Sequence, residues 1–241
     1  MVARSDRFES INPTVYRYIA EDRELSAELE NYESLNRLER LSKIVSTIIV
    51  PRLNLLEVKL LDISERNKGK EVPRRVDGEQ VGKITIDEIF NGYARRLADR
   101  KKQLAETPLN SAYDHEAEMN DRISDMFYFA VSTFSALANI ANDIRHHFRT
   151  EIGEYRHKVY DHKRVGSSTM PHKQNPVEYE QVVSLWKTQV PRLVSAVMSQ
   201  VVEHQSDSTN LALPGYTLEL HCILAYAAKK LEKAIGNLGI N

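Results

Sequence analysis

The sequence predicts an all-α protein folded as an elongated bundle of long helices, and three observations favour this class. Apolar residues recur at steps of three and four over long stretches, which is the period of one helix face. The 241 residues include only 9 glycines and 8 prolines, whereas a β-sandwich or barrel needs a turn about every 8–12 residues. No segment alternates apolar and polar residues as a half-buried strand does, and no internal repeat stands out.

The first elements in chain order are helical. One apolar stripe lies along a helix and consists of Leu25, Leu29, Tyr32, Leu38, Leu41 and Val45. Pro51 interrupts the continuation of this stripe, so we expect a kink or a short break there. The stripe resumes after the proline and ends at Gly69. Residues 71–83 then read as a loop, because they contain one proline and two glycines.

A second helix begins with a capping-box pattern. The hydroxyl of Thr85 and the carboxylate of Glu88 are spaced to satisfy unpaired amides at a helix start. This helix is expected to end before Pro108. A third, longer helix is predicted over residues 116–152, and Gly153 suits its C-cap.

Two more helices complete the predicted bundle. The fourth begins at Pro176, with Asn175 as its N-cap, and a kink is expected at Pro191. The fifth is predicted from residue 216 to about residue 235 and ends at Gly236. Helices of this length rarely cover their apolar faces alone, which favours a homo-oligomer, most simply a tetramer.

Residues 1–40 are interpreted as a helical N-terminal segment and residues 41–241 as a central helical-bundle domain. The chain is 41% apolar and 28% charged, which is typical of a folded protein with a sizeable core. Its net charge of -1 provides no basic field for nucleic acid or for an anionic membrane, so neither is expected as a partner.

The remaining composition excludes further classes. Cys222 is the single cysteine, so neither an intramolecular disulfide nor a multi-cysteine metal site is possible. No histidine and carboxylate spacing predicts a metal site, and no metal or cofactor is expected. No apolar run approaches the ~20 residues of a membrane span, and the start of the chain lacks the apolar core of a signal peptide. A cytoplasmic protein is therefore expected.

One segment breaks the helical pattern: residues 166–176, Gly-Ser-Ser-Thr-Met-Pro-His-Lys-Gln-Asn-Pro. A glycine and two hydroxyls indicate a flexible loop that leads into the fourth helix. The amino end of a helix with Lys173 beside it favours a bound carboxylate or phosphate. The basic residues between 156 and 164 are, by themselves, typical of a solvated loop; beside an anion site they would attract a negatively charged ligand.

This segment resembles the signature of the fumarase/aspartase superfamily, Gly-Ser-Ser-x-Met-Pro-x-Lys-x-Asn-Pro, and every fixed position is present. Residues 143–154 and 203–210, together with His172 inside the signature, are similar to the adenylosuccinate lyase branch of that family. The resemblance is clear from about residue 122 to residue 235. It implies the helical central domain of the family for this part of the chain.

The resemblance also implies a reaction, namely a β-elimination that releases fumarate in purine nucleotide biosynthesis. Ser167 or Ser168 would be the base that removes a proton next to a carboxylate, and Glu180 would orient a catalytic histidine. Lys173 and Asn175 would stabilise the dianionic intermediate. Further contacts to a small anionic substrate, a dicarboxylate or a nucleotide-linked one, would come from Met170, His172, Gln205 and Thr209.

The sequence departs from the family pattern at several positions. Where members carry Thr-His-Gly-Gln with the acid histidine, this chain has Val-Asp-Gly-Glu, so Asp77 takes the histidine's place. Ser206 replaces an arginine that meets the substrate phosphate. The C-terminal domain of the family is absent by this interpretation, because the sequence stops at Asn241. His115 is a candidate replacement acid, whereas His146 and His147 are interpreted as surface or interhelical residues.

Three functional interpretations remain open. The chain is a shortened lyase with weak activity of its own, or it is a non-catalytic helical scaffold or partner subunit of the same family. In the third interpretation, the chain supplies its serine loop to a longer partner, because active sites of the family are assembled from several subunits.

Overall fold

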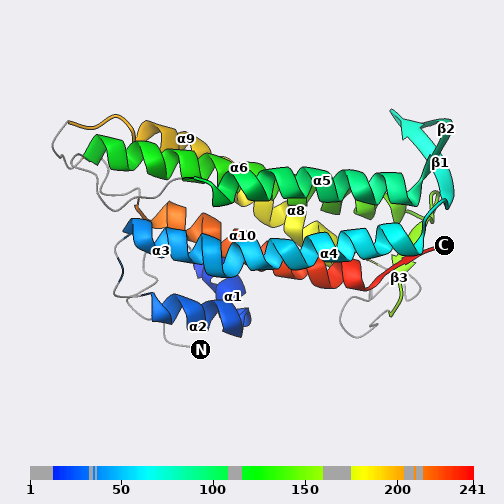
Figure 1. Ribbon diagram of the computed structural model, residues 1–241, viewed down its shortest axis with the longest axis horizontal. Helices are drawn as coiled ribbons and strands as arrows, with labels where there is room; N and C mark the ends of the chain where they lie inside the picture. Colours follow the sequence, from blue (N-terminus) through cyan, green and yellow to red (C-terminus); the bar gives the residue numbers. More distant parts are fainter. Residues whose placement is uncertain are drawn as a thin grey trace.

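The computed structural model describes residues 13–32, 35, 37–107, 116–159, 175–203, 209 and 214–241. It is an elongated helical bundle, and the predicted all-α class is confirmed (Figure 1). The four long helices of the bundle are α4 (Val50–Arg66), α5 (Ile86–Ala105), α6 (Glu116–His147) and α10 (Pro214–Gly236). α4 packs on α5 and α10, α6 packs on the same two helices, and α8 (Val177–Gln189) lies against α6 and α10.

The core lies between these helices and is built from their apolar faces. Each helix contributes side chains that are fully buried, among them Leu53 on α4, Phe90 on α5, Phe134 on α6, Tyr179 on α8 and Leu224 on α10. Burying a side chain of this size stabilises the fold by about 1.5–3 kcal/mol relative to leaving it exposed. The bundle is therefore held together mainly by its apolar faces.

The prediction of one continuous helix from residue 25 to residue 45 is wrong. The chain forms α1 (Pro13–Glu21), α2 (Arg23–Asn31) and α3 (Arg37–Lys43), so the stripe is divided between α2 and α3. α2 ends at Tyr32, whose carbonyl accepts a hydrogen bond from Nε of Arg40 at 3.1 Å. α1 and α2 pack on α10. The division of the chain at residue 40 stays a prediction.

The irregularity expected near Pro51 is present, but it is neither a kink nor a break. Ile44–Ile49 form a π-helical turn that leads directly into α4. The N–H of Val50 donates to the carbonyl of Val45, five residues earlier. A proline has no N–H and its ring collides with the carbonyl four residues before it, and the wider π turn lets the helix continue past the ring.

The predicted loop over residues 71–83 is instead a β-hairpin, which corrects the sequence interpretation. β1 (Glu71–Val76) pairs antiparallel with β2 (Glu79–Thr85). Asp77 and Gly78 connect the strands with φ of 52° and 89°. Positive φ at both central residues defines a type I′ turn, and Asp-Gly is a preferred sequence for it.

The start of α5 confirms the predicted capping box. Glu88 N–H bonds the hydroxyl of Thr85 at 3.3 Å, and the Glu88 carboxylate accepts from Thr85 N–H at 3.0 Å. α5 ends at Ala105, before Pro108 as expected. α6 begins at the predicted residue but ends at His147 and not at Ile152, because turns replace the last predicted helical turn. Gly153 then adopts φ of 60°.

Around α8, one sequence prediction holds in part and one is wrong. The N-cap is Pro176 and not Asn175, and no side chain caps this helix start. The irregularity expected at Pro191 is present, but it is a break and not a kink, because α8 ends at Gln189 and α9 (Arg192–Met198) follows. α10 is followed by a short strand, β4 (Leu238–Ile240), which pairs antiparallel with β3 (Tyr155–His157).

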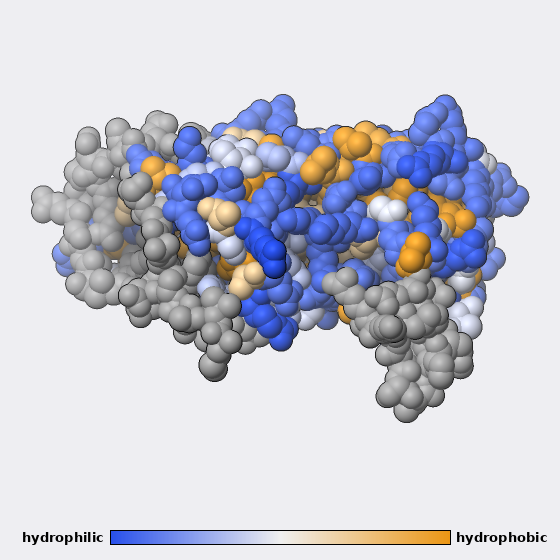
Figure 2. Space-filling model, turned by 90° about the horizontal axis from the view of Figure 1, so that it is seen from below, coloured by the Kyte–Doolittle hydropathy of each residue, from blue (hydrophilic) through white to orange (hydrophobic). Residues whose placement is uncertain are grey.

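The surface of the described residues on the face shown in Figure 2 is mostly hydrophilic, with separate apolar patches. Within the described part of the chain, no helix combines the length and the apolar character needed to cross a membrane.

Candidate functional site

Most of the residues that the sequence predicts for the site lie outside the described residues. These are Ser167, Ser168, Met170, His172, Lys173 and Gln205. Asn175 and Glu180 are described, at the start of α8, and Thr209 is described as an exposed turn residue. The structure therefore places the chain up to Val159, before the signature segment, and again from Asn175, near the end of that segment, into α8.

Before the signature segment, the chain is held at Val159 by Asn237, which comes directly after α10. Its side-chain oxygen accepts from the N–H of Val159 at 2.9 Å, and its side-chain nitrogen donates to the carbonyl of Val159 at 2.8 Å. The backbone carbonyl of Asn237 accepts from the N–H of Lys158 at 2.8 Å. Together with the β3–β4 pair, these bonds hold the chain as far as Val159.

Asn175, near the end of the signature segment, lies close to β3. A ring nitrogen of His157, on β3, lies 3.3 Å from the carbonyl oxygen of Asn175. The ring of His157 also packs against Phe148 at a centroid distance of 4.8 Å. Glu180 lies in the first turn of α8 and is exposed. A carboxylate in that position is available to a group that approaches from outside the bundle.

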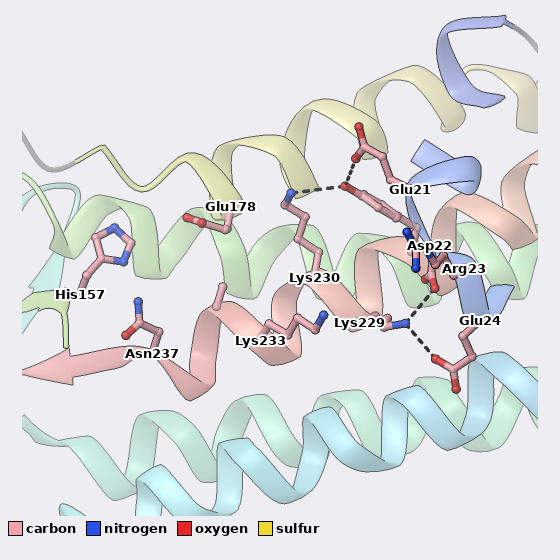
Figure 3. Close-up of a pocket in the computed structure, with 12 residues that line it drawn as sticks. Glu21, Asp22, Arg23, Glu24, His157, Glu178, Lys229, Lys230, Lys233 and Asn237 are labelled. Atoms are coloured by element: carbon pink, nitrogen blue, oxygen red, sulfur yellow. Dashed lines mark hydrogen bonds and ion pairs between the residues drawn. The ribbon is translucent and has the colours of Figure 1, made fainter. Parts of the chain in front are cut away.

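A groove of about 790 Å³ leads from His157 and Asn237 along α10 to the N-terminal helices (Figure 3). His157, Asn237 and Glu178 lie at one end of it, and Lys233 projects from α10 between them and the N-terminal helices. The Oε2 atom of Glu178 is buried and has no hydrogen-bond partner.

The far end of the groove holds a fully bonded ionic group, which we call the N-terminal salt-bridge cluster: Asp22, Glu24, Arg52 and Lys229. Lys229 Nζ lies 2.8 Å from a carboxylate oxygen of Asp22 and from one of Glu24. Arg52 bonds Asp22 at 2.6 Å and Glu24 at 3.1 Å. This cluster fixes α2 to α4 and α10.

The second region that the resemblance singles out is the hairpin turn. Asp77, in the place of the family's acid histidine, is exposed at the tip between β1 and β2. Its φ of 52° is one that aspartate tolerates better than most residues do. A carboxylate there has no means of acting as a cationic proton donor.

Sequence reasoning missed a group of ionisable residues beside this hairpin. Glu154 binds Arg75 of β1 at 2.6 Å and a ring nitrogen of His147 at 2.7 Å. The His147 ring stacks on Tyr155 at a centroid distance of 4.6 Å. His147 ends α6, and the turn through Gly153 brings Glu154 back to it. A histidine at a helix end, followed by a glycine and then a carboxylate, is the signal that would have found the pair.

This group borders a cleft of about 1160 Å³ between the β1–β2 hairpin, α5 and the C-terminal end of α6, which we call the hairpin cleft. Asp143 lies in it and accepts a hydrogen bond from the hydroxyl of Tyr93 at 3.4 Å. Burial raises the pKa of Asp143 above its ordinary value despite that bond. Burial also raises the pKa of Tyr93, so the hydroxyl keeps its proton.

Among the described residues, no group of three or more histidine, cysteine, aspartate or glutamate side chains is placed to hold a metal ion. The imidazole of His221 illustrates why an isolated histidine is not a site here. It is fully buried, and burial lowers its pKa to about 4 while Nδ1 bonds the carbonyl of Thr217 at 2.7 Å. His221 is therefore a neutral core residue.

Comparison with known proteins supports the family resemblance. A family model described as lyase matches residues 83–191, which include α5, α6, the signature segment and α8. Adenylosuccinate lyase of Pyrococcus abyssi is 32% identical over 119 residues, which are 49% of this chain and 26% of that enzyme. Adenylosuccinate lyase of Methanocaldococcus jannaschii is 31% identical over 213 residues, covering 73% of this chain and 46% of that enzyme.

A lyase with a different named substrate is equally similar. N-acetyl-S-(2-succino)cysteine lyase of Dickeya dadantii is 32% identical over 126 residues, which are 49% of this chain and 25% of that enzyme. The chain thus spans less than half the length of these curated relatives. Among solved structures, a fumarate lyase:delta crystallin from Brucella melitensis matches with a TM-score of 0.74 at 17% identity. The match covers 85% of this chain and 55% of that chain.

The structural match concerns the fold alone, but the family model spans the signature segment and the helices on both sides of it. Fold, family model and signature agree on one lineage, and the chain belongs to the fumarase/aspartase superfamily.

Proposed function

We propose that this chain is an adenylosuccinate lyase-like protein that binds a succino-bearing substrate and releases fumarate from it slowly. The observation that carries the proposal is the signature segment, residues 166–176, which leads directly into α8 with Glu180 exposed in the first turn. The names of the similar enzymes support the substrate class, because both adenylosuccinate and (2-succino)cysteine carry a succino group on a heteroatom.

In the proposed reaction, a base removes a proton from the carbon next to a carboxylate of the succino group. The electron pair forms the carbon–carbon double bond of fumarate, and the bond from carbon to the heteroatom breaks. The leaving heteroatom takes a proton from an acid. We assign the base to Ser167 or Ser168, and Lys173 and Asn175 stabilise the dianion that forms after the first proton leaves. Met170, His172, Gln205 and Thr209 remain proposed substrate contacts.

Slow turnover follows from the hairpin turn. The acid histidine of the family is replaced by Asp77, which is exposed at the tip of β1–β2. Loss of a general acid typically lowers the rate by a factor of about 10²–10⁴. The serine at position 206, in place of an arginine, is expected to weaken binding of a substrate phosphate as well.

A second candidate function is a non-catalytic subunit of the same superfamily. The observation that favours it is the same turn: an Asp-Gly pair satisfies a type I′ hairpin well, so position 77 is explained without any catalytic role. In this interpretation the chain supplies helices, or its serine loop, to a longer partner.

We further propose a homo-oligomer, with a tetramer as the expected form. Two helices expose apolar side chains to solvent in the single chain: Leu55, Val58 and Leu61 on α4, and Val194, Val197 and Met198 on α9. Their exposed fractions range from 44% to 67%. Association would bury these stripes. Light scattering of the purified chain tests this proposal, and a monomer at micromolar concentration would contradict it.

The lyase proposal is tested by measuring cleavage of adenylosuccinate and of N-acetyl-S-(2-succino)cysteine by the purified chain. We expect slow release of fumarate that the double variant Ser167→Ala/Ser168→Ala abolishes. No fumarate from either compound with the purified chain alone would favour the non-catalytic subunit.

The missing acid is tested by restoring an imidazole at the hairpin turn. Asp77→His should raise the rate of fumarate release, because histidine also tolerates a positive φ and the turn is kept. Asp77→Asn is the matched control: it keeps the turn without supplying a proton donor and should leave the rate low. Equal rates in the two variants would mean that position 77 is not where the acid acts.

A further inference from the structure

The hairpin cleft has a rigid floor. Glu154 holds Arg75 at 2.6 Å and His147 at 2.7 Å, so β1, the end of α6 and the residue before β3 are joined by one carboxylate. The side chains of Glu154 and His147 are only 12% and 20% exposed. A site whose supporting groups are fixed in this way loses little entropy when a ligand binds.

Above this floor, the cleft is lined by two exposed arginines in addition to Arg75. Arg74 from β1 and Arg149 from the turn after α6 both line the cleft. Within the described part of the chain, neither guanidinium has a hydrogen-bond or salt-bridge partner. The Nη1 atom of Arg75 is buried and also has no acceptor. Donors of a buried guanidinium are normally satisfied, so an unpaired one indicates that an acceptor is missing.

A histidine also lines this part of the cleft. His146 lines the cleft, and burial together with the charges of Arg149 and Arg145 lowers the pKa of His146. Asp143 acts in the opposite direction but does not cancel the effect. The carboxylate of Asp143 is occupied by the Tyr93 hydroxyl, and the other acidic residue of the lining, Glu151, is exposed on the outer turn.

We propose that the hairpin cleft binds a small anion through a phosphate or carboxylate group held by Arg74 and Arg149. Guanidinium groups suit this role because their donors match both oxyanions in a bidentate geometry. The volume of about 1160 Å³ admits a molecule much larger than the anionic group itself. Glu151 is then available as an acceptor for a hydroxyl or an amine on the same ligand.

This inference does not rest on the proposed lyase function, since the signature residues take no part in it. The experiment is isothermal titration calorimetry of the full chain at constant ionic strength, with inorganic phosphate as one probe and succinate as the other. We expect saturable binding of at least one probe. Binding of phosphate alone identifies a phosphate site, and binding of succinate alone identifies a carboxylate site.

Two double variants locate the binding. Arg74→Met/Arg149→Met should weaken it at least about tenfold, because two charge-assisted contacts are lost. Arg66→Met/Arg122→Met is the matched control, since both arginines are exposed and lie on α4 and at the other end of α6. The control should bind like the wild type. Circular dichroism should show that all variants keep their helical content.

The outcomes are decisive in both directions. The proposal is overturned if neither probe binds saturably, or if the two double variants bind equally well. Ser167→Ala/Ser168→Ala separates this site from the lyase site: it should abolish any fumarate release and leave binding in the hairpin cleft intact. A failed lyase assay therefore leaves this result unchanged.

Discussion

At the N-terminal helices, Arg52 and Lys229 share the carboxylates of Asp22 and Glu24, and each of the four groups is bonded to at least two others. At the hairpin end, Arg75 and His147 share Glu154, but the neighbouring Arg74 and Arg149 have no partner among the described residues. One cluster is closed and the other is partly open. Both border a cavity, but Asp22 and Arg52 of the closed cluster are buried, whereas Arg74 and Arg149 are exposed.

The difference has a physical reason. Removing charges from water is costly, and a structural cluster offsets that cost only if every charge is paired. Arg74 and Arg149 are exposed and stay hydrated without a protein partner, so they carry no such cost. Removing a charge should therefore be costly in the N-terminal salt-bridge cluster and nearly neutral in the hairpin cleft.

The largest effect is expected for Arg52→Met. The Arg52 side chain is 7% exposed and donates to Asp22, to Glu24 and to the carbonyl of Ala225. Its loss leaves Asp22 buried with one cation fewer, and the free energy of unfolding should fall by roughly 3–5 kcal/mol. Chemical denaturation measures this. Arg66→Met, on the same helix but in an exposed pair with Asp62, is the control and should change it by less than about 1 kcal/mol.

The second effect concerns acid stability. Burial by itself raises the pKa of Asp22, but hydrogen bonds from Lys229 and Arg52 outweigh burial and hold that pKa below its ordinary value. A carboxyl with a lowered folded pKa stabilises the fold above its unfolded pKa of about 3.9, and this contribution is lost as the pH falls further. Unfolding free energy should therefore decrease below about pH 4, by up to about 1.4 kcal/mol per pH unit for each proton taken up.

Asp22→Asn is the matched variant for this titration. It should be less stable than the wild type at pH 6, and the difference should shrink at pH 3, because protonation of the Asp22 carboxyl then favours the unfolded wild-type chain. Urea denaturation at the two pH values is the measurement. A difference that stays constant with pH would show that the charge of Asp22 contributes nothing.

A smaller effect on the unfolding free energy is expected for Glu154→Gln, in the partly open cluster. The amide keeps the size of the carboxylate but loses the charge that holds Arg75 and His147, so we expect a loss of about 1–2 kcal/mol, less than for Arg52. Faster hydrogen exchange of the β1 and β2 amides should accompany it. Glu71→Gln removes an exposed partner of Lys83 on the same hairpin and should leave exchange unchanged.

The smallest effect is expected for Arg74→Met and Arg149→Met. Neither side chain has a partner to lose among the described residues, so the unfolding free energy should change by less than about 0.5 kcal/mol, and a slight gain is expected from reduced repulsion. Thermal unfolding of each variant measures this. A loss comparable to that of Glu154→Gln would mean that these arginines are structural, and the contrast between the two clusters would disappear.

The sequence by itself determined the helical class and most helix ends, because these depend on local chemistry. Apolar periodicity placed α5, α6 and α10, and the Thr85 capping box and Pro191 marked boundaries that the structure keeps. It also determined the lineage, since the signature segment is contiguous and each of its positions can be read directly. Even the hairpin was readable: the Asp77-Gly78 pair is a local turn signal that the proline and glycine content of the segment obscured.

Only the tertiary structure decided which charges meet. Asp22 and Lys229 are separated by 207 positions, and Arg75 meets Glu154 across two helices. No local pattern distinguishes these residues from the many charged side chains that remain in water. The division of the first stripe between α2 and α3, the π turn before Pro51 and the closed and open ionic clusters all depend on packing between distant segments. That packing is set by the burial of apolar faces, which is not directional along the sequence.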